Sequence, residues 1–151
     1  MKILLINSSV PRVGKTTFST QLQQKYKGIK HLAFAQPIKD ISIELANTLY
    51  CHTQTDNPAF VSYSSTNKDK PIGGEVFGNT TPRELVCDVS NLITKVTHKD
   101  IWGSVALSGI RQAELEGFKV CIFDDWRRPQ EAEFLRSQSD LEVTSLYLQK
   151  E

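Results

Sequence analysis

The sequence is poor in the features that mark secreted or membrane proteins. Its three cysteines, Cys51, Cys87 and Cys121, are odd in number and form no C-x-x-C pair, which indicates reduced thiols and a cytoplasmic protein. We interpret each of them as a buried structural residue. No apolar run approaches the roughly 18 residues of a membrane span. The first apolar stretch covers only Ile3 to Ile6, so we expect no signal peptide and no membrane contact.

The chain also has almost no net charge. The chain has 18 basic and 17 acidic residues and a net charge of +1, so we expect neither a nucleic acid nor a membrane as a partner. The three histidines, His31, His52 and His98, lack metal-site spacing and are interpreted as surface or internally satisfied residues. The length of 151 residues predicts one domain that spans residues 1–151.

Alternating strand and helix patterns predict an α/β fold with a parallel sheet covered on both faces. The predicted strands are about 2–6, 30–34, 119–123 and 142–148, and the predicted helices about 15–27, 37–49, 82–96, 100–116 and 129–137.

Three segments carry more specific signals. Thr81 to Glu84 read as a capping box that opens a helix. Residues 50–80 have the composition of a loop and no periodicity, which predicts a lid or a substrate-binding segment. In the second predicted helix four apolar residues share one face, namely Ile38, Ile41, Leu45 and Leu49.

A phosphate-binding loop follows the first predicted strand. Residues 9–16 match the pattern G-x-x-x-x-G-K-[ST], except that Ser9 replaces the first glycine. In this pattern backbone N–H groups surround a polyphosphate, the lysine reaches the outer phosphates, and the hydroxyl binds Mg²⁺. The sequence therefore predicts a nucleoside triphosphate site, and an ordinary strand-to-helix turn is the alternative. The predicted loop residues are Ser9, Arg12, Val13, Gly14, Lys15, Thr16 and Thr17.

Acidic and basic residues follow the third predicted strand. Because ligands bind at the carboxyl ends of parallel strands, Asp125 could hold Mg²⁺ or orient the attacking group there. Arg127 could clamp a phosphate with two parallel hydrogen bonds. The alternative is that Asp125 caps the next helix and that Arg127 is a solvated surface residue. Arg12, Lys39 and Arg83 are weaker candidates for phosphate contacts, because each could equally be a solvated charge.

Four blocks of the sequence carry a resemblance to a known family. They are residues 8–17, residues 34–40, residues 81–85 together with 100–102, and residues 122–131. In this order they resemble the bacteriophage deoxynucleoside monophosphate kinases, a branch of the P-loop nucleoside monophosphate kinases. The resemblance implies a three-layer P-loop NTPase fold with about four parallel strands in the order 2-3-1-4. It also implies transfer of the γ-phosphate of ATP to a deoxynucleoside monophosphate with Mg²⁺.

The resemblance also implies roles for individual residues. Lys15 and Thr16 match the phosphate and metal residues of the loop, and Asp125 and Arg127 match the family's Asp-x-Arg after the third strand. Arg83 matches an arginine that opens the helix lining the monophosphate site. The implied catalytic residues are Lys15, Asp125 and Arg127, and the implied metal ligands are Thr16 and Asp125. The implied acceptor-binding residues are Lys39, Arg83, Trp102, Arg127 and Arg128.

The sequence also departs from the family, and other interpretations stay open. Residues 85–91 differ from the family's stretch near the acceptor, so the acceptor base is not assigned. The family's segment that helps to hold the adenine of ATP does not follow the last strand here. A nucleotide-binding protein without kinase activity, which sequesters a nucleotide or binds a host partner, is therefore one alternative. A second alternative is another small-molecule kinase of this fold, such as a dephospho-coenzyme A kinase. The adenine pocket could also be completed by the partner in a homodimer.

Overall fold

The computed structural model describes residues 1–8, 13–53, 61–126 and 128–149. The chain divides into two compact units, one made of Met1–Ala35 with Lys99–Glu151 and the other of Gln36–His98. The prediction of one kinase-like domain stays a prediction. Within the described residues no helix has both the length and the apolar character that crossing a membrane requires.

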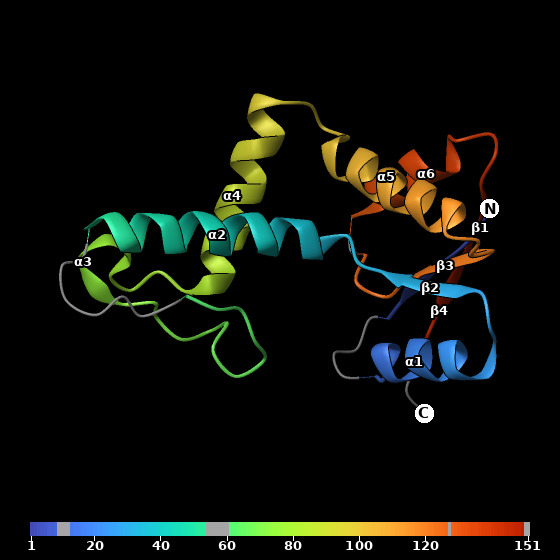
Figure 1. Ribbon diagram of the computed structural model, residues 1–151, viewed down its shortest axis with the longest axis horizontal. Coiled ribbons are helices and arrows are strands. Elements are labelled where there is room, and N and C mark those ends of the chain that lie inside the picture. The colour runs from blue at the N-terminus through green and yellow to red at the C-terminus, as the bar shows by residue number, and fades with distance from the viewer. Residues whose placement is uncertain (9–12, 54–60, 127, 150–151) are drawn as a thin grey trace. The chain divides into compact units, whose positions relative to one another are not determined.

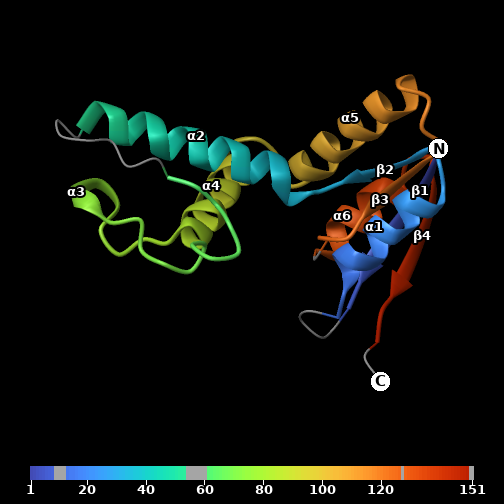
Figure 2. The ribbon, with the colours of Figure 1, turned by 60° about the horizontal axis from the view of Figure 1, so that its bottom comes forward.

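The first unit contains a parallel sheet of four strands. These are β1 (Lys2–Asn7), β2 (Ile29–Leu32), β3 (Val120–Phe123) and β4 (Glu142–Tyr147), and they lie in the order β2-β3-β1-β4. Leu5 of β1 pairs with Phe123 on one side and with Ser145 on the other, and Figure 2 shows β1 and β4 running in the same direction. The α/β fold and the predicted strand order 2-3-1-4 are therefore confirmed.

Three helices flank this sheet. α1 (Lys15–Lys25) lies on one face, while α5 (Ile101–Leu115) and α6 (Pro129–Arg136) lie on the other (Figure 1). The central strands are apolar because both of their faces are covered. The core of this unit is built from Ile3, Leu5, Phe34, Ala106, Ile110, Ala113, Cys121, Phe123, Ala132 and Leu135.

The second unit contains α2 (Ala35–Thr53), α3 (Gly74–Phe77) and α4 (Pro82–Val96). The capping box at the start of α4 is confirmed, because the Thr81 side chain accepts a hydrogen bond from the Glu84 N–H and the Glu84 carboxylate accepts one from the Thr81 N–H. The predicted loop 50–80 is partly helical, since it contains the end of α2 and the short α3. Residues 54–60 of that predicted loop lie outside the described residues.

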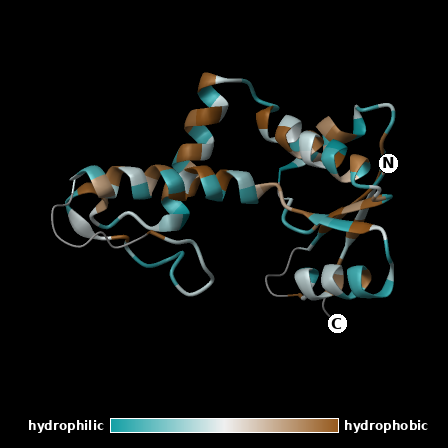
Figure 3. Ribbon diagram, viewed as in Figure 1, coloured by the Kyte–Doolittle hydropathy of each residue, from teal (hydrophilic) through white to brown (hydrophobic). Residues whose placement is uncertain are grey.

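The apolar face predicted for α2 is wrong in part. Ile38 is buried, but Ile41, Leu45 and Leu49 are 40–44% exposed, and Ser42, Ala46 and Tyr50 are buried instead. The small core of this unit lies against the side of α2 that carries Ala46 and Tyr50, so that side is buried. There Tyr50 stacks on Phe77, with ring centroids 6.2 Å apart. Figure 3 shows apolar and polar residues alternating along α2. The periodicity of the sequence alone therefore does not decide which of two neighbouring faces of the helix is buried.

The cysteines form no disulfide, as the sequence predicts, but only one of them is buried. Cys121 lies on β3 in the core, where burial raises the pKa of its thiol to about 11. Cys51 and Cys87 are exposed, so the expectation of burial is wrong for these two. Both lie on helices of the second unit, whose small core needs few side chains from each helix.

Candidate functional site

The loop between β1 and α1 ends in a glycine with a left-handed backbone. Gly14 has φ 92° and ψ 23°, a left-handed conformation that favours glycine. Its carbonyl accepts the first hydrogen bond of α1 from the Phe18 N–H, at 2.8 Å. The helix begins directly afterwards at Lys15. Ser9 and Arg12, which the sequence also assigns to this loop, lie outside the described residues.

The first turn of α1 is suited to an anion. No side chain among the described residues caps its N-terminus, and no acidic residue lies in its first turn. The backbone N–H groups there have no partners within the helix, and the helix dipole adds partial positive charge at the same end. Lys15, Thr16 and Thr17 are the residues of this turn. Their positions match those that the motif predicts, and Val13 directly precedes the glycine.

Asp124 lies at the end of β3, the strand next to β1, and is 7% exposed. Its Oδ1 lies 2.9 Å from His31 Nε2, at the end of β2. Burial acts to raise the pKa of Asp124, but His31 and the hydroxyls of Thr16 and Ser19 outweigh it and lower that pKa overall. The same contact raises the pKa of His31, against the effect of its own burial. A negative charge is thus held next to the first residues of α1.

The residues at this point fit a magnesium ion. Asp124 Oδ2 is buried, and no described residue donates a well-formed hydrogen bond to it. The hydroxyl of Thr16 lies close enough to affect the Asp124 carboxylate. Among the described residues no three His, Cys, Asp or Glu side chains form a metal cluster. Mg²⁺ at a nucleotide site needs no such cluster, because one or two protein oxygens, phosphates and waters complete its coordination.

Asp125 faces a different part of the protein. Its Oδ1 accepts a hydrogen bond from the Phe34 N–H and its Oδ2 one from the Ala35 N–H, both at 2.9 Å. Because Ala35 is the first residue of α2, Asp125 caps that helix and not α6, the helix that follows it in sequence. The structure therefore brings Asp124, rather than the predicted Asp125, to Thr16. The predicted metal-binding role of Asp125 stays a prediction.

The predicted acceptor residues of the first unit lie together in part. The buried Trp102 of α5 and the exposed Arg128, just before α6, line one cavity of about 320 Å³. The Arg128 N–H lies 3.3 Å from a carboxylate oxygen of Glu131, which closes the first turn of α6. Arg127, predicted to clamp the acceptor phosphate, lies outside the described residues.

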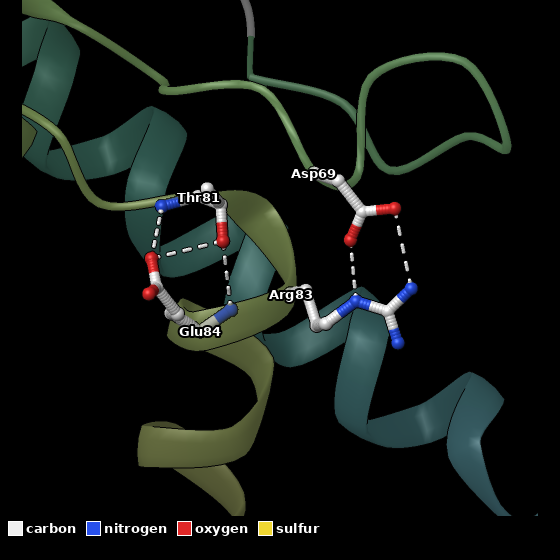
Figure 4. A network of polar contacts seen from close by, with 4 residues as sticks. All are labelled: Asp69, Thr81, Arg83 and Glu84. Atoms are coloured by element: carbon white, nitrogen blue, oxygen red, sulfur yellow. Dashed lines mark hydrogen bonds and ion pairs between the residues drawn. The ribbon is translucent and has the colours of Figure 1, made fainter.

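The predicted acceptor residues of the second unit line two separate cavities. Lys39 of α2 lines a groove of about 790 Å³, and its Nζ lies 5.1 Å from the centre of the Tyr63 ring. Arg83 of α4 lines another cavity and is paired with Asp69 (Figure 4). The structure therefore assigns Lys39 and Arg83 to one unit and Trp102 and Arg128 to the other.

Sequence reasoning missed three residues of these sites: His31, Asp69 and Asp124. Asp124 is the first polar residue after an apolar strand, and this position at the strand's carboxyl end was the available signal. His31 lies inside β2 and gave no such signal. Asp69 gave no signal, because its role depends on the contact with Arg83. No protein-family model matches the chain, and no curated protein sequence matches it.

Proposed function

We propose that this protein is an ATP-dependent phosphotransferase whose acceptor is a deoxynucleoside monophosphate, working in the cytoplasm. The observation that carries the proposal is the meeting of three features at one edge of the sheet. They are the left-handed Gly14 before α1, the Lys15–Thr16 pair in the first turn, and the buried carboxylate of Asp124 next to Thr16. An uncapped helix end alone binds anions of many kinds. The added hydroxyl and carboxylate favour a metal-bound polyphosphate.

The residues have distinct tasks in this proposal. Lys15 and the free N–H groups of α1 hold the β- and γ-phosphates and stabilise the charge that develops during transfer. Thr16 and Asp124 would hold Mg²⁺, which neutralises phosphate charge when it is bound. His31 keeps the Asp124 carboxylate ionised and in place, at a distance of 2.9 Å. No side chain needs to become a covalent nucleophile.

The acceptor side rests on the resemblance and on the cations of the second unit. We assign the acceptor phosphate to Arg83 and the predicted Arg127, and we assign weaker contacts to Lys39, Trp102 and Arg128. Arg83 is suited to this task because a guanidinium can form two parallel hydrogen bonds to one phosphate. The sequence and the structure leave the acceptor base open among the four deoxynucleosides.

A coupled assay with ATP, Mg²⁺ and each of the four deoxynucleoside monophosphates tests this proposal. Lys15→Ala should lose about 2.7 kcal/mol or more of transition-state stabilisation, as removal of a positioned electrostatic donor does. Lys25→Ala, at the other end of the same helix, is the matched control and should keep its activity. Equal activity in all three proteins contradicts the assignment of the loop. Nucleotide binding without transfer to any acceptor would favour the binding-protein alternative.

A further inference from the structure

Arg83 is held by an acidic residue of its own unit. Its Nε lies 2.5 Å from Asp69 Oδ1, and its Nη2 lies 3.3 Å from Asp69 Oδ2, so both carboxylate oxygens face one edge of the guanidinium (Figure 4). The backbone supports the contact, because the Arg83 N–H donates to the Lys68 carbonyl oxygen at 3.0 Å. Asp69 is therefore fixed beside the start of α4.

This arrangement uses the donors that a phosphate would use. A guanidinium presents its N–H groups in a planar fork that fits a carboxylate and a phosphate in the same two-point manner. While Asp69 occupies the edge formed by Nε and Nη2, a phosphate cannot form both hydrogen bonds there. Binding of an anion at that edge must therefore displace the Asp69 carboxylate.

The pair is placed so that such a displacement costs little. The Arg83 side chain is 44% exposed and that of Asp69 is 61% exposed, and exposed ion pairs are weak because water screens them. Asp69 lies between Lys68 and Lys70 in the sequence, and the backbone of Lys68 is bonded to that of Arg83, so displacement of its carboxylate leaves cations on both segments. Arg83 also lies in the first turn of α4, where the helix dipole disfavours a cation and favours an anion.

The exchange is a competition between anions and not a response to pH. The hydrogen bond to Arg83 lowers the pKa of Asp69, and the same bond raises the pKa of Arg83. Both groups therefore stay charged across the neutral range. The neighbouring carboxylate of Glu84 is already bound to the Thr81 N–H and hydroxyl, which leaves Asp69 as the acid that meets the guanidinium.

We propose that Asp69 is an internal counter-ion that occupies Arg83 until the phosphate of the acceptor monophosphate displaces it. The inference rests on the proposed function in one respect, which is that Arg83 receives the acceptor. Asp69 acts through Arg83 and is a positioning residue. It lowers the apparent affinity for the acceptor, because it competes for the N–H groups at Nε and Nη2.

Calorimetry on the full chain tests the competition. The four deoxynucleoside 5′-monophosphates are titrated into the wild type and into Asp69→Asn, Arg83→Gln and the double variant, with the unphosphorylated deoxynucleosides as ligand controls. Asp69→Asn should bind the accepted monophosphate roughly two- to fivefold more tightly, the range expected for loss of an exposed ion pair. The gain should vanish in the Arg83→Gln background and for ligands that lack the phosphate.

A second Asp–Arg pair supplies the matched control variant. Arg111 and Asp140 form an exposed ion pair in the other unit, so Asp140→Asn removes the same kind of contact and should leave monophosphate affinity unchanged. In the kinase assay, Asp69→Asn should lower the KM for the acceptor and leave kcat unchanged. A purely structural role for Asp69 would not lower the KM while leaving kcat unchanged.

The outcomes separate this inference from the proposed function. Unchanged or weaker monophosphate binding by Asp69→Asn overturns the inference, even if phosphoryl transfer is observed. A gain that persists in the Arg83→Gln background overturns it as well. Tighter binding without any transfer supports the inference and contradicts the kinase proposal. Absence of monophosphate binding in the wild type and in Asp69→Asn contradicts both.

Discussion

Asp124 and Asp125 are adjacent in the sequence, yet their carboxylates face different partners. Asp124 is buried beside His31 and the loop hydroxyls, while Asp125 binds two backbone N–H groups at the start of α2. Successive residues after a strand point in different directions, so a one-residue difference decides which acid meets Thr16 at the start of α1. Each assignment leads to a separate prediction at the scale of the residue.

Asp125→Asn should destabilise the protein even without nucleotide or Mg²⁺. An amide offers one acceptor oxygen where the carboxylate offers two, so one partly buried N–H loses its partner, at a cost of about 1–3 kcal/mol. Urea unfolding measures the effect. Asp40→Asn, an exposed acid on α2 that bonds only the Gln36 side chain, is the control and should change stability by about 0.5 kcal/mol or less. A stability equal to that of the wild type would show that Asp125 does not cap α2.

The contact between His31 and Asp124 should make stability depend on pH. The pKa of His31 is raised from 6.5 and that of Asp124 is lowered from 3.8, so the stabilisation is complete between these two ordinary values. It is lost as the pH rises through the pKa of His31 in the folded protein. It is also lost as the pH falls through that of Asp124.

The measurement is the difference in unfolding free energy between the wild type and His31→Gln in EDTA, from about pH 5 to about pH 9. We expect the difference to be largest at the acidic end of this range and to shrink as the pH rises. His98→Gln replaces an exposed histidine and is the control. A difference that grows with pH would contradict the assigned ion pair.

At the scale of elements, α5 depends on a glycine for its contact with α6. A Cβ atom added to Gly103 would lie 2.6 Å from Cδ1 and 3.1 Å from Cβ of Phe134. The second distance involves the rigid base of the side chain, so rotation of the ring alone does not relieve the overlap. The small residues on the buried side of α5, Gly103, Ala106 and Ala113, let this helix pack closely in its unit.

Gly103→Ala should therefore destabilise the protein by about 1–3 kcal/mol, as overpacking does. Gly109→Ala, on the same helix, is the matched control, because its added Cβ would lie 3.7 Å from Leu32 in ordinary contact. That change should be neutral or stabilising by up to about 1 kcal/mol, because alanine is the better helix former. Thermal unfolding of both variants gives the comparison. Equal effects at the two positions would contradict the described contact between α5 and α6.

At the scale of the whole molecule, the fold was far more predictable than the site. Strand β3 is continuously apolar because it is central, and α4 begins at a capping box, so local signals determine both elements. The short α3 and the buried face of α2 depend on packing inside the second unit, which no local pattern specifies. Gly14, Lys15 and Thr16 lie at the start of α1, where the sequence motif predicts them, but their binding of a phosphate stays a prediction.

Three further contacts, each inside one unit, join segments that are distant in the sequence. His31 meets Asp124, Asp125 meets Phe34, and Asp69 meets Arg83 across 14 residues. Such pairings follow from strand order and helix placement, so they become visible only when the elements are assembled. The assignments of the loop before α1 to a nucleotide and of Asp125 to a metal ion stay predictions, and the contact of Asp124 with Thr16 became apparent only from the structure.

The most direct test of the proposal is the transfer of labelled γ-phosphate from ATP to deoxynucleoside monophosphates, measured across Mg²⁺ concentrations. The wild type is compared with Asp124→Asn and Asp125→Asn, each shown by circular dichroism to be folded at the assay temperature. We predict transfer by the wild type, a loss of about a hundredfold or more for Asp124→Asn, and a requirement for more Mg²⁺ in that variant. Asp125→Asn, once folded, should keep the Mg²⁺ requirement of the wild type. Transfer by Asp124→Asn at the wild-type rate and Mg²⁺ concentration would contradict the account.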